Sequence, residues 1–302
     1  MSVVYLGTSD FAAAVLERLA AESLHRPALV VTRPDRGRGR GRRSASPPVA
    51  EAARRLGLEL AQPERVNDPE TAGRIIATAD EAPGAPHVVV CAFGALIGEQ
   101  LLAAQPIINV HPSLLPRWRG AAPVERAIMA GDERTGVSIM RLTAGLDEGP
   151  VCLAGEEPIG PEDTYGSLAG RLQALGGELL VRALEDAPPF REQAAEGVTY
   201  AEKITAEDRL LDAGRPAQEL ERTVRALYPH IGARLEIPGR ETVGVRRARL
   251  AEQEDVPAGT LASRDGRLLL GATPGTLQLV EVQPPGGRTM DAAAYLRGHP
   301  LT

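Results

Sequence analysis

The chain has 302 residues, of which 43% are hydrophobic and 25% are charged, and this composition excludes a wholly disordered chain. At roughly 150 residues per domain, the length predicts two domains. Lys and Arg total 34 while Asp and Glu total 40, which gives a net charge of −6. This balance excludes a uniformly basic nucleic-acid-binding protein, although a local basic patch can still bind a nucleic acid.

The first 110 residues alternate short apolar runs with helical patterns. We predict strands over residues 2–6, 28–32, 87–92 and 106–110. A helix is predicted to begin at Ser9 or Asp10, and another to cover 48–56. Apolar strands separated by helices favour a Rossmann-like α/β domain with a mainly parallel sheet covered on both faces. Ligands of such sheets bind beyond the carboxyl ends of the strands, which singles out the loops after Cys91 and Val110.

The rest of the chain predicts a second, smaller domain. Strands over 136–142 and 151–159 and a helix over 165–184 continue the first pattern. A polar stretch then predicts a linker, so we place a first domain at 1–187, the linker at 188–203 and a second domain at 204–302. After a helix over 217–226, five short strands separated by Gly and Pro turns favour a small, OB-like β-barrel. These strands are predicted at 233–237, 242–250, 259–263, 267–272 and 275–282.

The cysteines and the N-terminal sequence indicate the cellular compartment in which we expect the protein. Cys91 and Cys152 lie in apolar stretches without a Cys-x-x-Cys pair, which argues against a disulfide framework or a structural zinc site. We expect Cys91, on a buried strand, to act as a small hydrophobic residue rather than a nucleophile. The N-terminus has no basic segment followed by a long apolar run, and no run of 18 apolar residues occurs. We therefore expect a cytoplasmic protein without membrane association.

The segment IINVHPSLLPRWRGAAP, at 107–123, carries the strongest chemical signal. A buried strand delivers Asn109 and His111 to its carboxyl end, and their spacing of two places both side chains on the same side of an extended chain. An amide donor beside an imidazole can polarise a carbonyl group and stabilise its oxyanion. The alternative is a pair that only caps the strand, and these residues alone leave both interpretations open.

The segment TAGLDEGP, at 143–150, offers a carboxylate. Asp147 is the candidate functional group, and Glu148 is its competitor. Taken alone, the pattern favours a turn in which Asp147 binds its own backbone.

The segment RPDRGRGRGRR, at 33–43, carries six Arg and one Asp, a local charge of +5. It lacks the GK[ST] ending of a phosphate-binding P-loop. We favour a mobile basic arm near the strand ends, suited to a phosphodiester backbone, over a solvated loop without function. Another Gly-containing segment, GTSDF, has one glycine where a dinucleotide-binding fingerprint needs three, so NAD binding is disfavoured.

Together these segments resemble the folate-dependent formyltransferases, and within them the branch that acts on methionyl-tRNA. The similarity runs almost end to end and is densest over the first 160 residues. It is carried by GTSDFA, RPDRGRGRGRR with SPPV, CAFGALI, the central motif, TGVSIMRL, GLDEGP, YAEKI and LRGHP.

The resemblance implies an activity and its residues. Members of this branch transfer the formyl group of 10-formyltetrahydrofolate to the α-amino group of methionine on initiator Met-tRNA, without a metal. The catalytic trio is implied to be Asn109, His111 and Asp147. The folate-binding residues are implied to be Phe93, Gly94, Leu96, Ser113, Leu114, Leu115 and Pro116. Arg36, Arg38, Arg40, Arg42 and Arg43 are implied to approach the tRNA, together with the domain at 204–302. We expect a monomer.

Some residues depart from the family pattern. Ala213 replaces a Trp that often follows Asp after YAEKI, and His230 and Ile231 stand in a turn that is usually aromatic and Pro-rich. The alternatives are formylation of a nucleotide-linked amino sugar, formylation of glycinamide ribonucleotide, hydrolysis of the formyl donor, and a non-catalytic RNA-binding protein. The basic segment favours tRNA, and the intact trio favours an enzyme.

Overall fold

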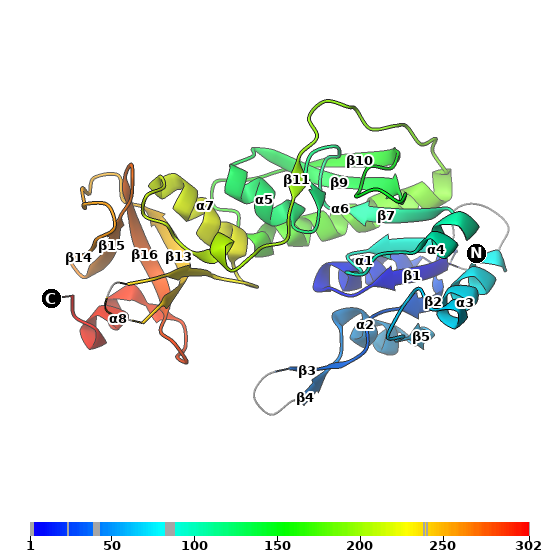
Figure 1. Cartoon of the computed structure of the whole chain (residues 1–302), viewed down its shortest axis with the longest axis horizontal. Coiled ribbons are helices and arrows are strands. Elements are labelled where there is room, and N and C mark those ends of the chain that lie inside the picture. The colour runs from blue at the N-terminus through cyan, green and yellow to red at the C-terminus, as the bar shows by residue number, and fades with distance from the viewer. Residues whose placement is uncertain are drawn as a thin grey trace. The chain divides into compact units, whose positions relative to one another are not determined.

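The chain folds into two compact units, which we describe separately (Figure 1). The structure, a computed structural model, describes residues 3–22, 24–38, 43–81, 88–237, 239 and 241–301. Ser2 and His87, at the starts of two predicted strands, lie outside this range, as do Arg40 and Arg42 of the basic segment. Unit 1 comprises residues 1–120, 135–157 and 169–200, and unit 2 comprises 121–134, 158–168 and 201–302.

Unit 1 is built on a seven-stranded sheet in the order β10-β9-β7-β6-β1-β2-β5. Strands β5, β2, β1, β6 and β7 pair in parallel, and β9 runs antiparallel to β7, so the predicted mainly parallel sheet is confirmed. The strand order reverses between β1 and β6, which makes their carboxyl ends the expected ligand-binding crevice. The strands are β1 (Val3–Gly7), β2 (Pro27–Val31), β5 (Leu60–Ala61), β6 (Val88–Cys91), β7 (Ile107–His111), β9 (Arg134–Arg141) and β10 (Val151–Pro158).

Helices cover both faces of this sheet, as predicted. On one face, α3 and α4 pack on buried residues of β1, β2 and β6. On the other, Gly176 of α6 comes so close to β7 that a Cβ there would lie 3.1 Å from Val110. Ser9 caps α1 by accepting a hydrogen bond from Ala12 N at 3.3 Å, which confirms the predicted helix start. The helices are α1 (Asp10–Ala21), α2 (Pro48–Leu56), α3 (Pro69–Asp80), α4 (Glu99–Ala104) and α6 (Tyr165–Asp186).

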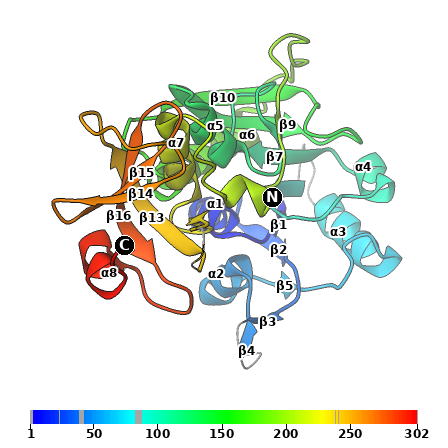
Figure 2. The same cartoon turned by 60° about the vertical axis from the view of Figure 1, so that its left-hand side comes forward.

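The described part of the basic segment forms two paired strands, which the sequence did not predict. Strands β3 (Arg36–Arg38) and β4 (Arg43–Ala45) pair antiparallel and project beyond β5 and α2 (Figure 2). A second small sheet pairs β8 (Arg119–Gly120) with β11 (Tyr200–Ala201).

Unit 2 contains an antiparallel sheet in the order β12-β13-β16-β15-β14, with β17 paired to β16. The helix predicted over 217–226 and the five predicted strands are confirmed, whereas α8 and β17 were not predicted. Register shifts within β13 bend the sheet around a core it shares with α7, an arrangement consistent with a small β-barrel. The elements are α5 (Pro123–Ala130), a 3-10 turn (Glu207–Arg209), α7 (Ala217–Leu227), β12 (Ala233–Leu235), β13 (Val243–Leu250), β14 (Leu261–Arg264), β15 (Arg267–Gly271), β16 (Thr276–Gln283), β17 (Met290–Asp291) and α8 (Ala292–Gly298).

Unit 2 draws on an earlier part of the chain because α5 packs against α7. Arg126 of α5 makes a two-pronged ion pair with Asp208, with N–O distances of 2.7 and 3.0 Å. At one departure from the family pattern, His230 lies 2.9 Å from the buried Glu125 carboxylate, and its ring stacks on Tyr165. Because His230 gains both a partner and a stacking surface, it fits this turn. None of the helices in the described ranges has the length and hydropathy needed to cross a bilayer.

Candidate active site

Strand β7 carries Asn109 and His111 to the carboxyl edge of the unit 1 sheet. It lies between β6 and β9, with Asn109 opposite Val90 and His111 opposite Ser138. Only 8% of Asn109 and 4% of His111 is exposed. Both side chains lie on the same face of the strand, as the spacing predicts. Among the described residues the Asn109 amide has no hydrogen-bond partner, so its donors and acceptor are available to a ligand.

His111 stands between two acceptors. Its Nε2 lies 2.9 Å from the Trp118 carbonyl oxygen, and its Nδ1 lies 3.7 Å from Oδ2 of Asp147. A carbonyl can only accept, so Nε2 carries a proton in this arrangement. The distance to Asp147 exceeds that of a hydrogen bond but allows an ion pair. Asp147 therefore faces the ring nitrogen of His111 that the Trp118 carbonyl group does not occupy.

The carboxylate next to His111 belongs to Asp147, and Glu148 is exposed. The Asp147 backbone is left-handed, with φ of 47°, and its Oδ2 accepts a hydrogen bond from Gly120 N at 2.9 Å. Asp147 thus binds a distant backbone group, so the turn-only interpretation does not describe it. A non-glycine residue in this backbone region is strained unless its surroundings hold it there.

The loop that follows β7 is fixed by internal hydrogen bonds. Ser113 Oγ donates to the Arg117 carbonyl oxygen at 2.6 Å, and Ser138 Oγ donates to the Ser113 carbonyl oxygen at 2.8 Å. Leu115 N donates to Ser138 Oγ at 3.2 Å, and the Leu115–Pro116 peptide is cis. Because the loop is tied to β9 in this way, the carbonyl oxygen of Trp118 is held against His111.

The residues implied to bind folate follow β6 and β7 along the same sheet edge. The side chains of Phe93 and Ser113 are buried, whereas Leu96 is 86% exposed. Leu114, Leu115 and Pro116 are half-buried. Gly94 has a left-handed backbone, with φ of 73°, and its carbonyl oxygen accepts from the Arg33 guanidinium. The edge therefore combines one exposed and three half-buried apolar residues with the buried Phe93 and Ser113.

The base of the basic hairpin is anchored by Asp35. Its carboxylate accepts from Gln62 Nε2 at 2.7 Å and from Ser46 Oγ at 2.9 Å, and these hydrogen bonds lower its pKa. Arg36 is exposed. Arg38 and Arg43 stand on the two paired strands, whereas Arg40 and Arg42 lie beyond the described residues.

Several groups that organise the site were not among the predicted residues. Gln193 Nε2 donates to the carbonyl oxygens of Asp147 and Gly149, both at 2.8 Å. Trp118 and Gly120 fall inside the central motif and could have been suspected, but Gln193 falls in the predicted linker, where no spacing marks it. The side chain of Thr199, in the same stretch, accepts from Trp118 N at 2.8 Å.

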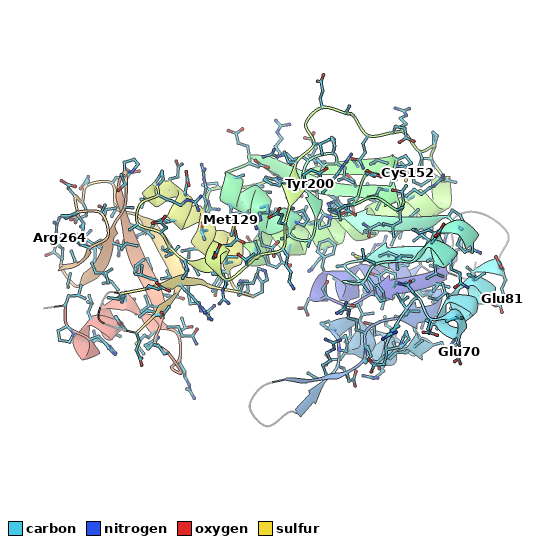
Figure 3. The ribbon with its side chains drawn as sticks, in the orientation of Figure 1. Glu70, Glu81, Met129, Cys152, Tyr200 and Arg264 are labelled. Atoms are coloured by element: carbon cyan, nitrogen blue, oxygen red, sulfur yellow. The ribbon has the colours of Figure 1, made fainter. Side chains whose placement is uncertain are left out.

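The cysteines lie apart from this edge. Cys91 is buried, and burial raises the pKa of its thiol to about 12, which confirms its hydrophobic role. Cys152, labelled in Figure 3, lines a cavity of about 430 Å³ with Pro106 and Phe190, toward the amino end of β7. No predicted site residue lines this cavity. In the part of the chain that the structure describes, no cluster of His, Cys, Asp or Glu could hold a metal ion.

Two family sequence models match the chain and define its class. "Formyl transferase" matches residues 1–184, and "Formyl transferase, C-terminal domain" matches residues 203–300. The fold and the site therefore belong to a two-domain formyl transferase.

Curated relatives narrow this class. The methionyl-tRNA formyltransferase of Halorhodospira halophila is 43% identical over 307 residues, covering 99% of this chain and 96% of the relative. The methionyl-tRNA formyltransferase of Paracoccus denitrificans is 42% identical, covering 100% of this chain and 98% of the relative. The chain belongs to the methionyl-tRNA formyltransferase family.

Solved structures share the fold at low identity. An N-formyltransferase of Helicobacter canadensis in complex with folinic acid and dTDP-3-aminofucose has a TM-score of 0.65 and 14% identity, covering 92% of this chain and 98% of its own. HypX of Aquifex aeolicus in complex with tetrahydrofolic acid has a TM-score of 0.62 and 17% identity, covering 98% of this chain and 47% of its own.

Proposed function

We propose that this chain transfers the formyl group of 10-formyltetrahydrofolate to the α-amino group of methionine on initiator Met-tRNA, in the cytoplasm and as a monomer. The observation that carries the chemistry is the position of His111 between two acceptors, next to the unpartnered amide of Asn109. The choice of acceptor is supported by the full-length similarity to methionyl-tRNA formyltransferases. A monomer suffices because one unit supplies the whole proposed trio.

The trio suits attack by a neutral amine on a formyl carbon, which creates a tetrahedral oxyanion. Asn109 can donate its amide N–H to this oxygen. At 3.7 Å from Asp147, the Nδ1–H of His111 is not committed to the carboxylate and can donate as well. The negative charge of Asp147 stabilises an imidazolium at His111 until the carboxylate takes up the proton of the amine.

Asp147 can also carry the proton that passes from the amine to N10. As the amine nitrogen bonds to the formyl carbon it becomes positively charged, and its proton must leave. Asp147 can accept this proton and return it to N10 as the bond between carbon and N10 breaks. The charge on the enzyme is then restored, and the products are the formylated amine and tetrahydrofolate.

The two substrates would use different surfaces. We propose that the folate lies along the sheet edge that follows β6 and β7, against the exposed Leu96 and the half-buried loop from Leu114 to Pro116. The site suits a folate because it combines apolar side chains with the buried amide of Asn109, which has no hydrogen-bond partner among the described residues.

We propose that the tRNA contacts arginines of each unit. In unit 1 these are the five arginines of the basic segment, Arg36, Arg38, Arg40, Arg42 and Arg43. In unit 2, burial and the positive charges of Arg234 and Arg246 lower the pKa of Arg209, so all three arginines contribute to the local positive charge. Such a cluster favours an anionic partner, which supports a tRNA-binding role for residues 204–302.

The test compares formyl acceptors. The purified protein is incubated with 10-formyltetrahydrofolate and either initiator Met-tRNA or a nucleotide-linked amino sugar, and the acceptor is analysed by mass spectrometry. We expect N-formylmethionyl-tRNA and no formylated sugar. Formylation of the sugar alone, or release of formate with neither product, would overturn the proposal.

A further inference from the structure

The chain that leaves α6 returns along unit 1 and binds both loops of the site. We call residues 191–199 the strap; Figure 1 shows the loop between α6 and β11 to which it belongs. Arg191 exchanges two backbone hydrogen bonds with Val151, at 2.8 and 2.9 Å, just beyond the Asp147 loop. At the other end, Thr199 accepts from Trp118 N and from Arg119 N. Exposed Tyr200, labelled in Figure 3, follows the strap.

Gln193 is the strap residue that reaches the Asp147 loop. Its single side-chain nitrogen donates to two carbonyl oxygens, those of Asp147 and Gly149, both at 2.8 Å. Its oxygen accepts from the Arg119 guanidinium, with Nη2 at 2.8 Å and Nε at 3.1 Å. The charged donor polarises the amide, which strengthens the two bonds that the nitrogen makes.

These contacts enclose Asp147 from two sides. Gln193 holds its carbonyl group, and Gly120 N holds its carboxylate. Both residues are linked to Arg119. Gln193 accepts hydrogen bonds from its guanidinium group, and Gly120 is the next residue in the chain. Because Asp147 has a left-handed backbone, it needs such support to keep this conformation.

We propose that Gln193 is a positioning residue, which fixes the Asp147 carboxylate at its distance from His111 by holding the backbone of the Asp147 loop. The inference rests on the proposed function. The hydrogen bonds of the Gln193 side chain go to Arg119, Asp147 and Gly149 and not to His111 or Asn109, so its effect on turnover passes through Asp147. Misplacement of a catalytic group by about 1 Å can slow an enzyme by roughly 100-fold.

The sharpest variant is Gln193→Glu. The carboxylate has the same size and can still pair with Arg119, but it has no N–H to donate and it repels the two carbonyl oxygens. If the strap only stabilises the fold, this variant should be less stable but its folded fraction should turn over normally, whereas a positioning role predicts a folded enzyme that is slower. Gln193→Ala removes both sets of bonds.

The chain offers a matched control. Gln105, just before β7, donates from Nε2 to Asp80 Oδ1 at 2.5 Å, so Gln105→Glu also puts a carboxylate in place of an amide donor, at the amino end of β7 rather than at its carboxyl end. We expect kcat of Gln193→Glu and Gln193→Ala to fall about 10- to 100-fold. We expect KM for both substrates to change less than about twofold, because the variants are expected to bind both substrates in the ground state as the wild type does. Gln105→Glu is expected to keep both parameters, and all three variants are expected to unfold cooperatively in urea.

The outcomes separate this inference from the function on which it rests. Turnover of the wild type on Met-tRNA decides the proposed function, and the ratio of variant to wild type, measured with the acceptor that the wild type uses, decides the role of Gln193. A folded Gln193→Glu protein with wild-type kcat overturns the inference. Loss of cooperative unfolding in both Gln193 variants also overturns it, because the strap would then act on the fold.

Discussion

Replacing Asp147 by Asn tests whether the charge next to His111 drives the chemistry. The amide has nearly the shape of the carboxylate, can still accept from Gly120 N, and tolerates a left-handed backbone. The fold and the loop are therefore expected to survive, and only the negative charge is lost. Alanine would be a poorer choice because it removes the hydrogen bond together with the charge.

The magnitude follows from the distance between Nδ1 of His111 and Oδ2 of Asp147. At 3.7 Å, two unit charges attract by roughly 4 kcal/mol with an effective dielectric constant of about 20, a suitable value because little of either side chain is exposed. Each 1.36 kcal/mol corresponds to about a tenfold change in rate, so kcat is expected to fall about 1,000-fold. KM for 10-formyltetrahydrofolate is expected to stay within about twofold, since the lost interaction acts on the charged transition state.

The assay is single-turnover formation of N-formylmethionyl-tRNA, followed by separation of the formylated and unformylated aminoacyl groups. Glu148→Gln is the matched control, because Glu148 is the neighbouring carboxylate and is exposed. We expect this control to keep the wild-type rate. Near-normal turnover of Asp147→Asn, or an equal loss in Glu148→Gln, would refute the assignment of the charge to Asp147.

Three further predictions follow from the structure. Asn109→Ala is expected to lower kcat by about 100-fold or more, as when an oxyanion donor is lost. Its thermal stability is expected to stay unchanged, because the amide has no partner among the described residues. A normal kcat would remove Asn109 from the mechanism. Replacing Arg40 and Arg42 by Ala is expected to weaken tRNA binding and to reduce the log–log salt slope by roughly 0.7–0.9 per lost phosphate contact, with unchanged folate affinity; an unchanged slope contradicts it. The Arg126 ion pair lowers the pKa of Asp208 from 3.8 to about 2, so its stabilisation is present above pH 3.8 and is lost as pH falls toward 2. Urea unfolding of Arg126→Gln is expected to show less dependence on pH in this window, and the same dependence as the wild type would count against the pair.

The parallel sheet could be predicted because its strands are apolar throughout and end at turn residues. The same logic placed Asn109 and His111 on one face at a strand end, and the structure confirms it. It could not bring Asp147 to His111, because Asp147 lies in a loop 36 residues after His111 and no local pattern predicts their contact. Only the resemblance to a family implied that pairing.

Other features depended on packing between distant segments. The pairing of β3 with β4 escaped prediction because Gly and Arg have little strand preference. The helix α5 joins unit 2 because it packs against α7, which follows it by some ninety residues. The polar stretch after α6 looked like a linker by composition, yet its Gln193 and Thr199 hold the loops of the site. Composition reports solvent exposure but does not reveal a side chain's partners.

The most direct test of the account is the rate of N-formylmethionyl-tRNA formation by the wild type and by a variant that carries Asn109→Ala together with His111→Ala. Both proteins are first shown to be folded and to bind 10-formyltetrahydrofolate. The account predicts formylated initiator tRNA from the wild type and a rate lower by about 100-fold or more from the variant. No product from the wild type, or equal rates from both proteins, would contradict it.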